Sequence, residues 1–108
     1  LARPDATVIV AERGPMRLCG FAEAGARSHA DGCETSPVAY LEGWYVDPDA
    51  RLRGIGKELI RAVEQWARSR GLRELASDTQ LDNVASQRAH VRLGFSETER
   101  NVLYRKAL

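Results

Sequence analysis

One short stretch of the chain has residue types that suit the binding of an anion. It runs from Asp47 to Lys57 and reads DPDARLRGIGK, between the apolar run AYLEGWYV and the helical pattern ELIRAVEQWARS. Its glycines and basic residues are Arg51, Arg53, Gly54, Gly56 and Lys57. The first backbone N–H groups of a helix lack acceptors within it and attract negative charge. Because glycine has no Cβ, a phosphate can approach the backbone, so the stretch suits a pyrophosphate.

The spacing of these residues excludes two common nucleotide sites. The stretch has neither the GxxxxGK[ST] pattern of a P-loop nor the GxGxxG pattern of a dinucleotide fold. A nucleotide triphosphatase and a dinucleotide-binding domain are therefore disfavoured. The short pattern RxxGxG alone is equally compatible with an ordinary glycine-containing turn that carries surface arginines. The elements around it must decide between these interpretations.

The residues before this stretch predict strands. Thr7 to Arg13 is β-branched, Gly14-Pro15 is a turn signal, and Met16 to Ala24 resumes extended character, so we expect an antiparallel hairpin. Gly25 to Pro37 is polar and is predicted as a loop. Val38 to Val46 is long and largely apolar, which indicates a central strand.

The second half of the chain alternates between helical and extended patterns. Apolar residues from Gly56 to Arg70 recur on one helical face, and Gly71 supplies a stop. Leu72 to Asp78 predicts a short strand, Asn83 to Leu93 a second helix, and Glu97 to Lys106 a final strand. The predicted order is β-β-β-α-β-α-β, an α/β fold with helices packed on a mixed, largely antiparallel sheet.

Length and composition bound the class of protein. The 108 residues are 44% hydrophobic, which suffices for a single domain over 1–108. A formal charge of +1 gives no reason to expect a nucleic-acid partner or a membrane surface. The two cysteines, Cys19 and Cys33, form no CxxC motif, which favours a reducing, cytoplasmic setting.

Two motifs together resemble a known family. RLRGIGKELI resembles the Q/R-x-x-G-x-G/A signature with which GCN5-related N-acetyltransferases (GNATs) hold the pyrophosphate of acetyl-CoA. DNVASQRAHVRLGF resembles the family's N-x-x-A-x-x-x-Y-x-x-x-G-F helix, with Asn83, Gly94 and Phe95 in register. LEGWYVDPDARLRGIGKELIRAVEQW, ASDTQLDN and GFSETERNVLYRK are similar to the aminoglycoside 6′-N-acetyltransferase branch. Complete members begin with a further strand and two helices, for which we expect no counterpart here.

The resemblance implies a binding site for acetyl-CoA. The backbone of Trp44, Tyr45 and Val46 would lie along pantetheine, although the side chains of Trp44 and Tyr45 are better explained by packing. The residues implied around the pyrophosphate are Leu52, Arg53, Gly54, Ile55, Gly56 and Lys57. Asn83 would bind near the cysteamine end, or simply cap its helix. His90 would protonate the departing thiolate, or be buried for packing.

The resemblance also implies an acidic acceptor site, because an aminoglycoside is a polycation. Glu42, Asp78 and Glu99 are expected to converge from neighbouring strands, and His29 falls where an aromatic contact to the antibiotic is found. Glu42 is the most informative, since a carboxylate inside an apolar strand is costly without a partner. His29, Asp31 and Cys33 are weak candidates as metal ligands, and no metal is expected.

The expected reaction is direct transfer of the acetyl group to an amine, with Asp78 as the base and no cysteine nucleophile. Two alternatives remain open: acetylation of a peptide, polyamine or other small amine, and a noncatalytic acyl-CoA-binding module. A homodimer is also expected, because the outer edge of the first strand and the final strand both need partners.

Overall fold

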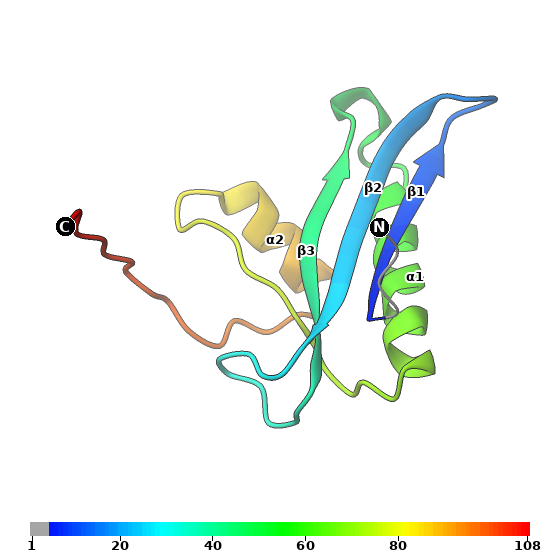
Figure 1. The fold of residues 1–108 in the computed structure, drawn as a ribbon. Helices are drawn as coiled ribbons and strands as arrows, with labels where there is room; N and C mark the ends of the chain where they lie inside the picture. Colours follow the sequence, from blue (N-terminus) through cyan, green and yellow to red (C-terminus); the bar gives the residue numbers. More distant parts are fainter. Residues whose placement is uncertain (1–4) are drawn as a thin grey trace. The chain divides into compact units, whose positions relative to one another are not determined.

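A computed structural model describes residues 5–108, which form two compact units. The first unit ends at Asp78, and the second begins at Thr79. The described part of the first unit contains a sheet and the helix α1 (Ile55–Ser69), and the second contains the helix α2 (Val84–Arg92), as Figure 1 shows. Within residues 5–108, no helix is long and apolar enough to cross a membrane.

The sheet of the first unit has the order β1-β2-β3-β4. The strands are β1 (Ala6–Glu12), β2 (Leu18–Arg27), β3 (Val38–Val46) and β4 (Leu75–Ala76). The first three pair antiparallel, which confirms the predicted hairpin and central strand, and β4 pairs parallel to β3. The mixed sheet and its two helices agree with the predicted α/β class.

Two strand boundaries differ from the sequence prediction. β2 continues to Arg27, so the first residues of the predicted loop Gly25 to Pro37 are strand, because they pair with the start of β3. The strand predicted over Leu72 to Asp78 is reduced to β4, since only Leu75 and Ala76 find partners on β3. Both corrections reflect backbone pairing, which local composition does not encode.

Helix α1 covers one face of the sheet (Figure 1). Its buried side chains are Leu59, Ile60, Val63 and Ala67, all on the predicted apolar stripe. They face small buried residues such as Ala22 and Ala39, which let the helix approach the strands closely. Burying each large aliphatic side chain contributes roughly 1.5 to 3 kcal/mol. This packing fixes the position of the turn that precedes the helix.

A β-bulge interrupts β3 at Glu42. Leu41 pairs with Ala24 and Gly43 pairs with Glu23, so Glu42 is an extra residue without an opposite partner in β2. Leu41 and Trp44 consequently both lie on the face covered by α1, although they are three positions apart. The bulge thus changes which residues of the strand face the helix.

The second unit consists of α2 and the segment that follows it. The predicted final strand, Glu97 to Lys106, is wrong for this structure: among residues 79–108 no strand is formed. The physical reason is that a strand needs a hydrogen-bonded neighbour, and this segment pairs with no strand. Its apolar residues Leu103 and Tyr104 are each 91% exposed.

Candidate active site

The turn before α1 has the geometry expected of an anion site. A short 3-10 helix, η1 (Pro48–Ala50), follows β3, and Gly54 then caps α1 in the left-handed conformation with φ of 81°. The first α-helical hydrogen bond runs from the Glu58 N–H to the Gly54 carbonyl at 3.0 Å. The N–H groups of Ile55, Gly56 and Lys57 therefore have no acceptor within the helix. Leu52, also at positive φ (63°), is 99% exposed.

The two glycines of the turn are required for different reasons. Gly54 needs its positive φ, and a Cβ there would meet nothing within 4 Å. Gly56 has ordinary helical conformation, but a Cβ there would lie 3.2 Å from Cζ2 of Trp44. Gly54 thus leaves open space beside the backbone, whereas Gly56 allows α1 to pack against β3.

Ion pairs and hydrogen bonds hold the turn on both sides. Arg51 donates from Nε to the carbonyl oxygen of Val46 at 2.8 Å, and its guanidinium lies 5.8 Å from the centre of the Tyr45 ring. Arg13 at the end of β1 pairs with both carboxylate oxygens of Asp49 in η1, at 2.7 and 2.9 Å. This pairing lowers the pKa of the Asp49 carboxyl. Arg53 and Lys57 remain exposed at the turn.

A shallow hollow of about 350 Å³ lies beside the turn. It is bounded by residues 9–12 of β1 on one side and by residues 53–55, Glu58 and Leu59 on the other. Its walls are mainly apolar, and the start of α1 forms one end of it. The hollow therefore joins an apolar surface to the unsatisfied N–H groups of the helix.

The second half of β3 has an open edge. Pairing with β4 ends at Tyr40, so among residues 5–78 the stretch 41–46 has a paired strand on the β2 side alone. The Trp44 ring packs toward Gly56 of α1, and the Tyr45 ring lies 6.1 Å from that of Phe21. The side chains of Trp44 and Tyr45 therefore make the packing contacts expected of them, while the edge of their strand leads directly into the turn.

Glu42 is exposed and already has a partner. Arg27 donates to it from Nε at 3.0 Å and from a terminal nitrogen at 2.7 Å, a two-pronged ion pair. The expected cost of a carboxylate in an apolar strand is avoided, because the Glu42 side chain is exposed and paired with Arg27. The same guanidinium lies 3.5 Å from the centre of the Tyr40 ring.

Tyr40 connects this ion pair to Asp78. Its hydroxyl donates a hydrogen bond to Oδ2 of Asp78, two residues after β4. Because β4 runs parallel to β3 with Tyr40 opposite Ala76, Asp78 reaches the same level of the sheet as Glu42. Burial of Tyr40 and the hydrogen bond to Asp78 raise the pKa of the phenol to about 12. The phenol is therefore a neutral donor at physiological pH.

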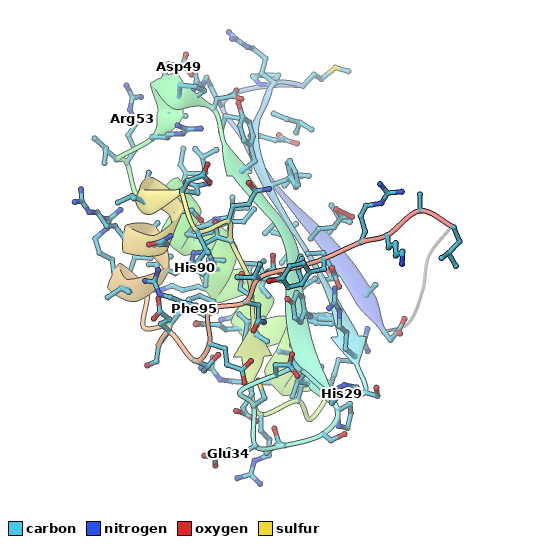
Figure 2. All side chains as sticks on the ribbon, turned by 90° about the vertical axis from the view of Figure 1, so that its left-hand side faces the viewer. His29, Glu34, Asp49, Arg53, His90 and Phe95 are labelled. Carbon is cyan, nitrogen blue, oxygen red and sulfur yellow. The ribbon has the colours of Figure 1, made fainter. Side chains whose placement is uncertain are left out.

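His29 lies in the loop between β2 and β3, where the hydroxyl of Ser28 is 3.2 Å from its Nδ1. In Figure 2, His29 and Glu34 lie at one end of the first unit and Asp49 and Arg53 at the other. The loop that carries His29 and the turn before α1 are thus at opposite ends of the sheet.

Glu74, the residue before β4, is hydrogen-bonded to the loop between β2 and β3. Its carboxylate accepts from the backbone N–H groups of Glu34 and Thr35, at 2.9 and 2.7 Å, and from the Thr35 hydroxyl. The Thr35 hydroxyl, then the backbone donors, lower the pKa of Glu74 below its usual 4.5. Because the pKa of Glu74 is lowered in the folded state, these contacts stabilise the fold at pH values above 4.5. The stabilisation is lost as the pH falls through the folded-state pKa.

Glu74→Gln should therefore lower the melting temperature at pH 7 by a few degrees, because the amide keeps the shape but loses the charge. The difference from the wild type should shrink as the pH falls below 4.5. Calorimetry across pH 3 to 7 measures both effects, with Glu64→Gln on the surface of α1 as the matched control. A pH-independent difference would exclude the charge as its cause.

The second unit positions Asn83 and His90. Asn83 caps α2 by accepting from the Ser86 N–H at 3.1 Å, so the structural interpretation of this residue is confirmed. His90 donates from Nδ1 to the Ser86 carbonyl oxygen at 2.7 Å, and its ring meets that of Phe95 edge-on at 5.0 Å (Figure 2). Glu99 lies in the exposed segment after α2.

The structure adds two residues that the sequence did not single out, Arg27 and Tyr40. Both lie on the sheet face opposite α1, since Arg27 pairs with Val38, and Tyr40 pairs with Gly25. The alternation of β3 from Val38 onward could have placed Tyr40 beside Glu42. Arg27 falls within the predicted loop Gly25 to Pro37, so local composition alone places it outside any strand.

Cysteine and metal chemistry find little support in the described residues. Cys19 is a free, buried residue of β2, and Cys33 is free in the loop after β2. Burial and the neighbouring Glu74 raise the pKa of the Cys33 thiol, which makes it a poor nucleophile. Within residues 5–108, no group of three or more histidine, cysteine or acidic side chains is placed to hold a metal ion.

Comparison with known proteins gives consistent matches. A sequence model described as "Acetyltransferase (GNAT) family" matches residues 1–95. An aminoglycoside N(6′)-acetyltransferase type 1 from Klebsiella aerogenes is 48% identical over 108 residues, covering 100% of this chain and 70% of the relative. The enzyme of the same name from Salmonella typhimurium is 51% identical over 88 residues, covering 81% of this chain and 61% of the relative.

A solved structure shows the same fold. It contains AAC(6′)-Iy in complex with the bisubstrate analogue CoA-S-monomethyl-acetylneamine. This chain superposes on it with a TM-score of 0.90 at 42% identity, over 98% of this chain and 72% of the other.

Proposed function

Because this chain belongs to the GNAT acetyltransferase family, we propose that it transfers the acetyl group of acetyl-CoA to the 6′-amino group of an aminoglycoside. The two curated relatives bear the name of this activity. The similar structure holds the bisubstrate analogue CoA-S-monomethyl-acetylneamine, which supports direct attack in a ternary complex. No metal takes part in the proposed reaction.

The observation that carries the proposal is the continuity between the open edge of β3 and the turn before α1. The backbone of Trp44 to Val46 offers hydrogen-bonding groups to the amides of pantetheine, much as a sheet edge accepts a peptide. The strand then leads into the turn at Leu52 to Lys57, whose helix N-terminus binds the pyrophosphate. In the second unit, Asn83 is assigned to the cysteamine end of the donor.

The acceptor is assigned to the acidic side of the sheet. Asp78 and Glu42 bind ammonium groups, Glu99 adds a third carboxylate, and His29 contacts the sugar rings. A polycation gains from several carboxylates even at an exposed site, because each pair adds a small Coulomb attraction. The alternative acceptors, peptides and small polyamines, would use fewer of these carboxylates at once.

The chemistry needs a neutral amine, a polarised carbonyl and a thiolate that can leave. Asp78 takes a proton from the ammonium, and the amine nitrogen then attacks the thioester carbon. A backbone N–H of the 44–46 stretch stabilises the oxygen that becomes negative. The carbon–sulfur bond breaks, and His90 gives a proton to the sulfur. The nitrogen, now part of an amide, loses its second proton to solvent water, which returns a proton to His90. Neither cysteine takes part, consistent with the burial of Cys19 and the raised pKa of Cys33.

Release of the CoA thiol measures this activity directly. We expect turnover with aminoglycosides that carry a 6′-amino group, and little with polyamines or peptides. Turnover with peptides or polyamines alone would be consistent with the family but would contradict an aminoglycoside as the acceptor. Binding of CoA without turnover on any amine would favour a noncatalytic acyl-CoA-binding module.

We also propose that the protein is a cytoplasmic homodimer. Among residues 5–108, β1 pairs with β2 alone, and the segment 97–106 carries strand-like apolar residues that pair with nothing. Edge pairing or exchange of this segment about a two-fold axis would satisfy both. Light scattering at micromolar concentration should give a mass near twice the 12.0 kDa of one chain. A monomer alone would contradict the proposed assembly.

A further inference from the structure

The hydrogen bond from Tyr40 to Asp78 joins two side chains of different burial. Asp78 is exposed, whereas the phenol that donates to it is partly buried in the sheet. A flexible surface carboxylate is thereby held by a group with a fixed position. General-base catalysis depends on such positioning, because the base must meet the proton at hydrogen-bonding distance.

Two groups restrain the Tyr40 ring itself. The Arg27 guanidinium stacks on it at 3.5 Å, and Glu42 holds that guanidinium with two hydrogen bonds. Gly25 lies opposite Tyr40 in β2, so no side chain occupies that position of the strand pair. Arg27, Glu42, Tyr40 and Asp78 thus form one continuous chain of contacts across β2, β3 and the end of β4.

We propose that Tyr40 is a positioning residue for this acetyl transfer: its hydroxyl aims the Asp78 carboxylate at the acceptor amine. This inference rests on the proposed function and on Asp78 as its base. The charged groups that face this contact are Arg27 from β2 and Glu42 from β3.

Tyr40→Phe tests the proposal with the smallest possible change, because phenylalanine keeps the ring and its stacking on Arg27. The kcat should fall about five-fold while the KM for acetyl-CoA stays the same, because the step that the base serves is slowed and the donor site is left intact. The affinity for CoA should not change. Ser69→Ala removes a hydroxyl that donates to the Trp66 carbonyl oxygen near the end of α1; it is the control and should leave all three unchanged.

A double-mutant cycle separates positioning from a general structural effect. If Tyr40 acts through Asp78, Tyr40→Phe should cause no further loss in an Asp78→Asn background. Equal losses in both backgrounds would overturn the proposal, and so would a raised KM for acetyl-CoA with an unchanged kcat in the single variant. A melting curve for each variant shows whether it is folded.

Two outcomes distinguish the role of Tyr40 from the proposed function. If the wild type acetylates no amine, the function is wrong and the inference falls with it. If the wild type is active and Tyr40→Phe has the same kcat, only the role of Tyr40 is wrong.

Discussion

Asp78→Asn lowers turnover with an aminoglycoside by about a hundredfold or more, if Asp78 is the base. Asparagine has nearly the same shape and still accepts a hydrogen bond from the Tyr40 hydroxyl, so the local structure is kept. What it loses is negative charge and basicity. The bound ammonium then has no group to which it can give its proton.

Thiol release under saturating acetyl-CoA measures this loss, and calorimetric titration of CoA shows that the donor site is unchanged. Asp82→Asn, at an exposed position just before α2, is the matched control and should keep wild-type turnover. Full activity in Asp78→Asn would leave Asp78 with at most a structural role at the end of β4.

The second large effect is expected at the start of α1. Gly54→Leu places a side chain in the open space beside the unsatisfied helix N–H groups, where the pyrophosphate is proposed to lie. The dissociation constant for CoA should rise about tenfold or more, which corresponds to about 1.4 kcal/mol. Isothermal titration provides the measurement.

The matched control lies at the other end of the same helix. Gly71 has φ of 75°, close to the 81° of Gly54, and a Cβ at either residue meets nothing within 4 Å. Gly71→Leu therefore introduces similar backbone strain without approaching the proposed pyrophosphate. Equal CoA affinity in the two variants would remove the pyrophosphate from this turn. Arg51→Ala should cost less than Gly54→Leu, because the Arg51 side chain is committed to the Val46 carbonyl.

The sequence predicted the elements whose signals are local. Helix α1 followed from its apolar periodicity and from Gly71, and β3 was placed at its observed bounds by a continuous apolar run. The length of β2 and the absence of a strand at Glu97 to Lys106 depend on which backbone groups find partners. Pairing is a property of two segments, so one segment's composition cannot determine it.

The candidate site also combines features with a local signal and contacts between segments that are distant in the sequence. The turn at Leu52 to Lys57 was predicted because the spacing of its glycines is a local signal. The contacts of Arg27 with Glu42 and of Tyr40 with Asp78 join residues 15 and 38 positions apart. The sequence singled out Glu42 and Asp78 as carboxylates, but the side chains that hold them become visible only when the strands are in register.

Because of the bulge at Glu42, the direction of the side chains in β3 depends more on the number of residues in the strand than on their types. Substituting Glu42 leaves Leu41 and Trp44 on the helix side, because the extra position remains. Deleting it would restore strict alternation and turn the Trp44 ring from Gly56 to the opposite face of the sheet. Insertions and deletions between Leu41 and Trp44 should therefore be far rarer among functional variants than amino-acid replacements at the same place.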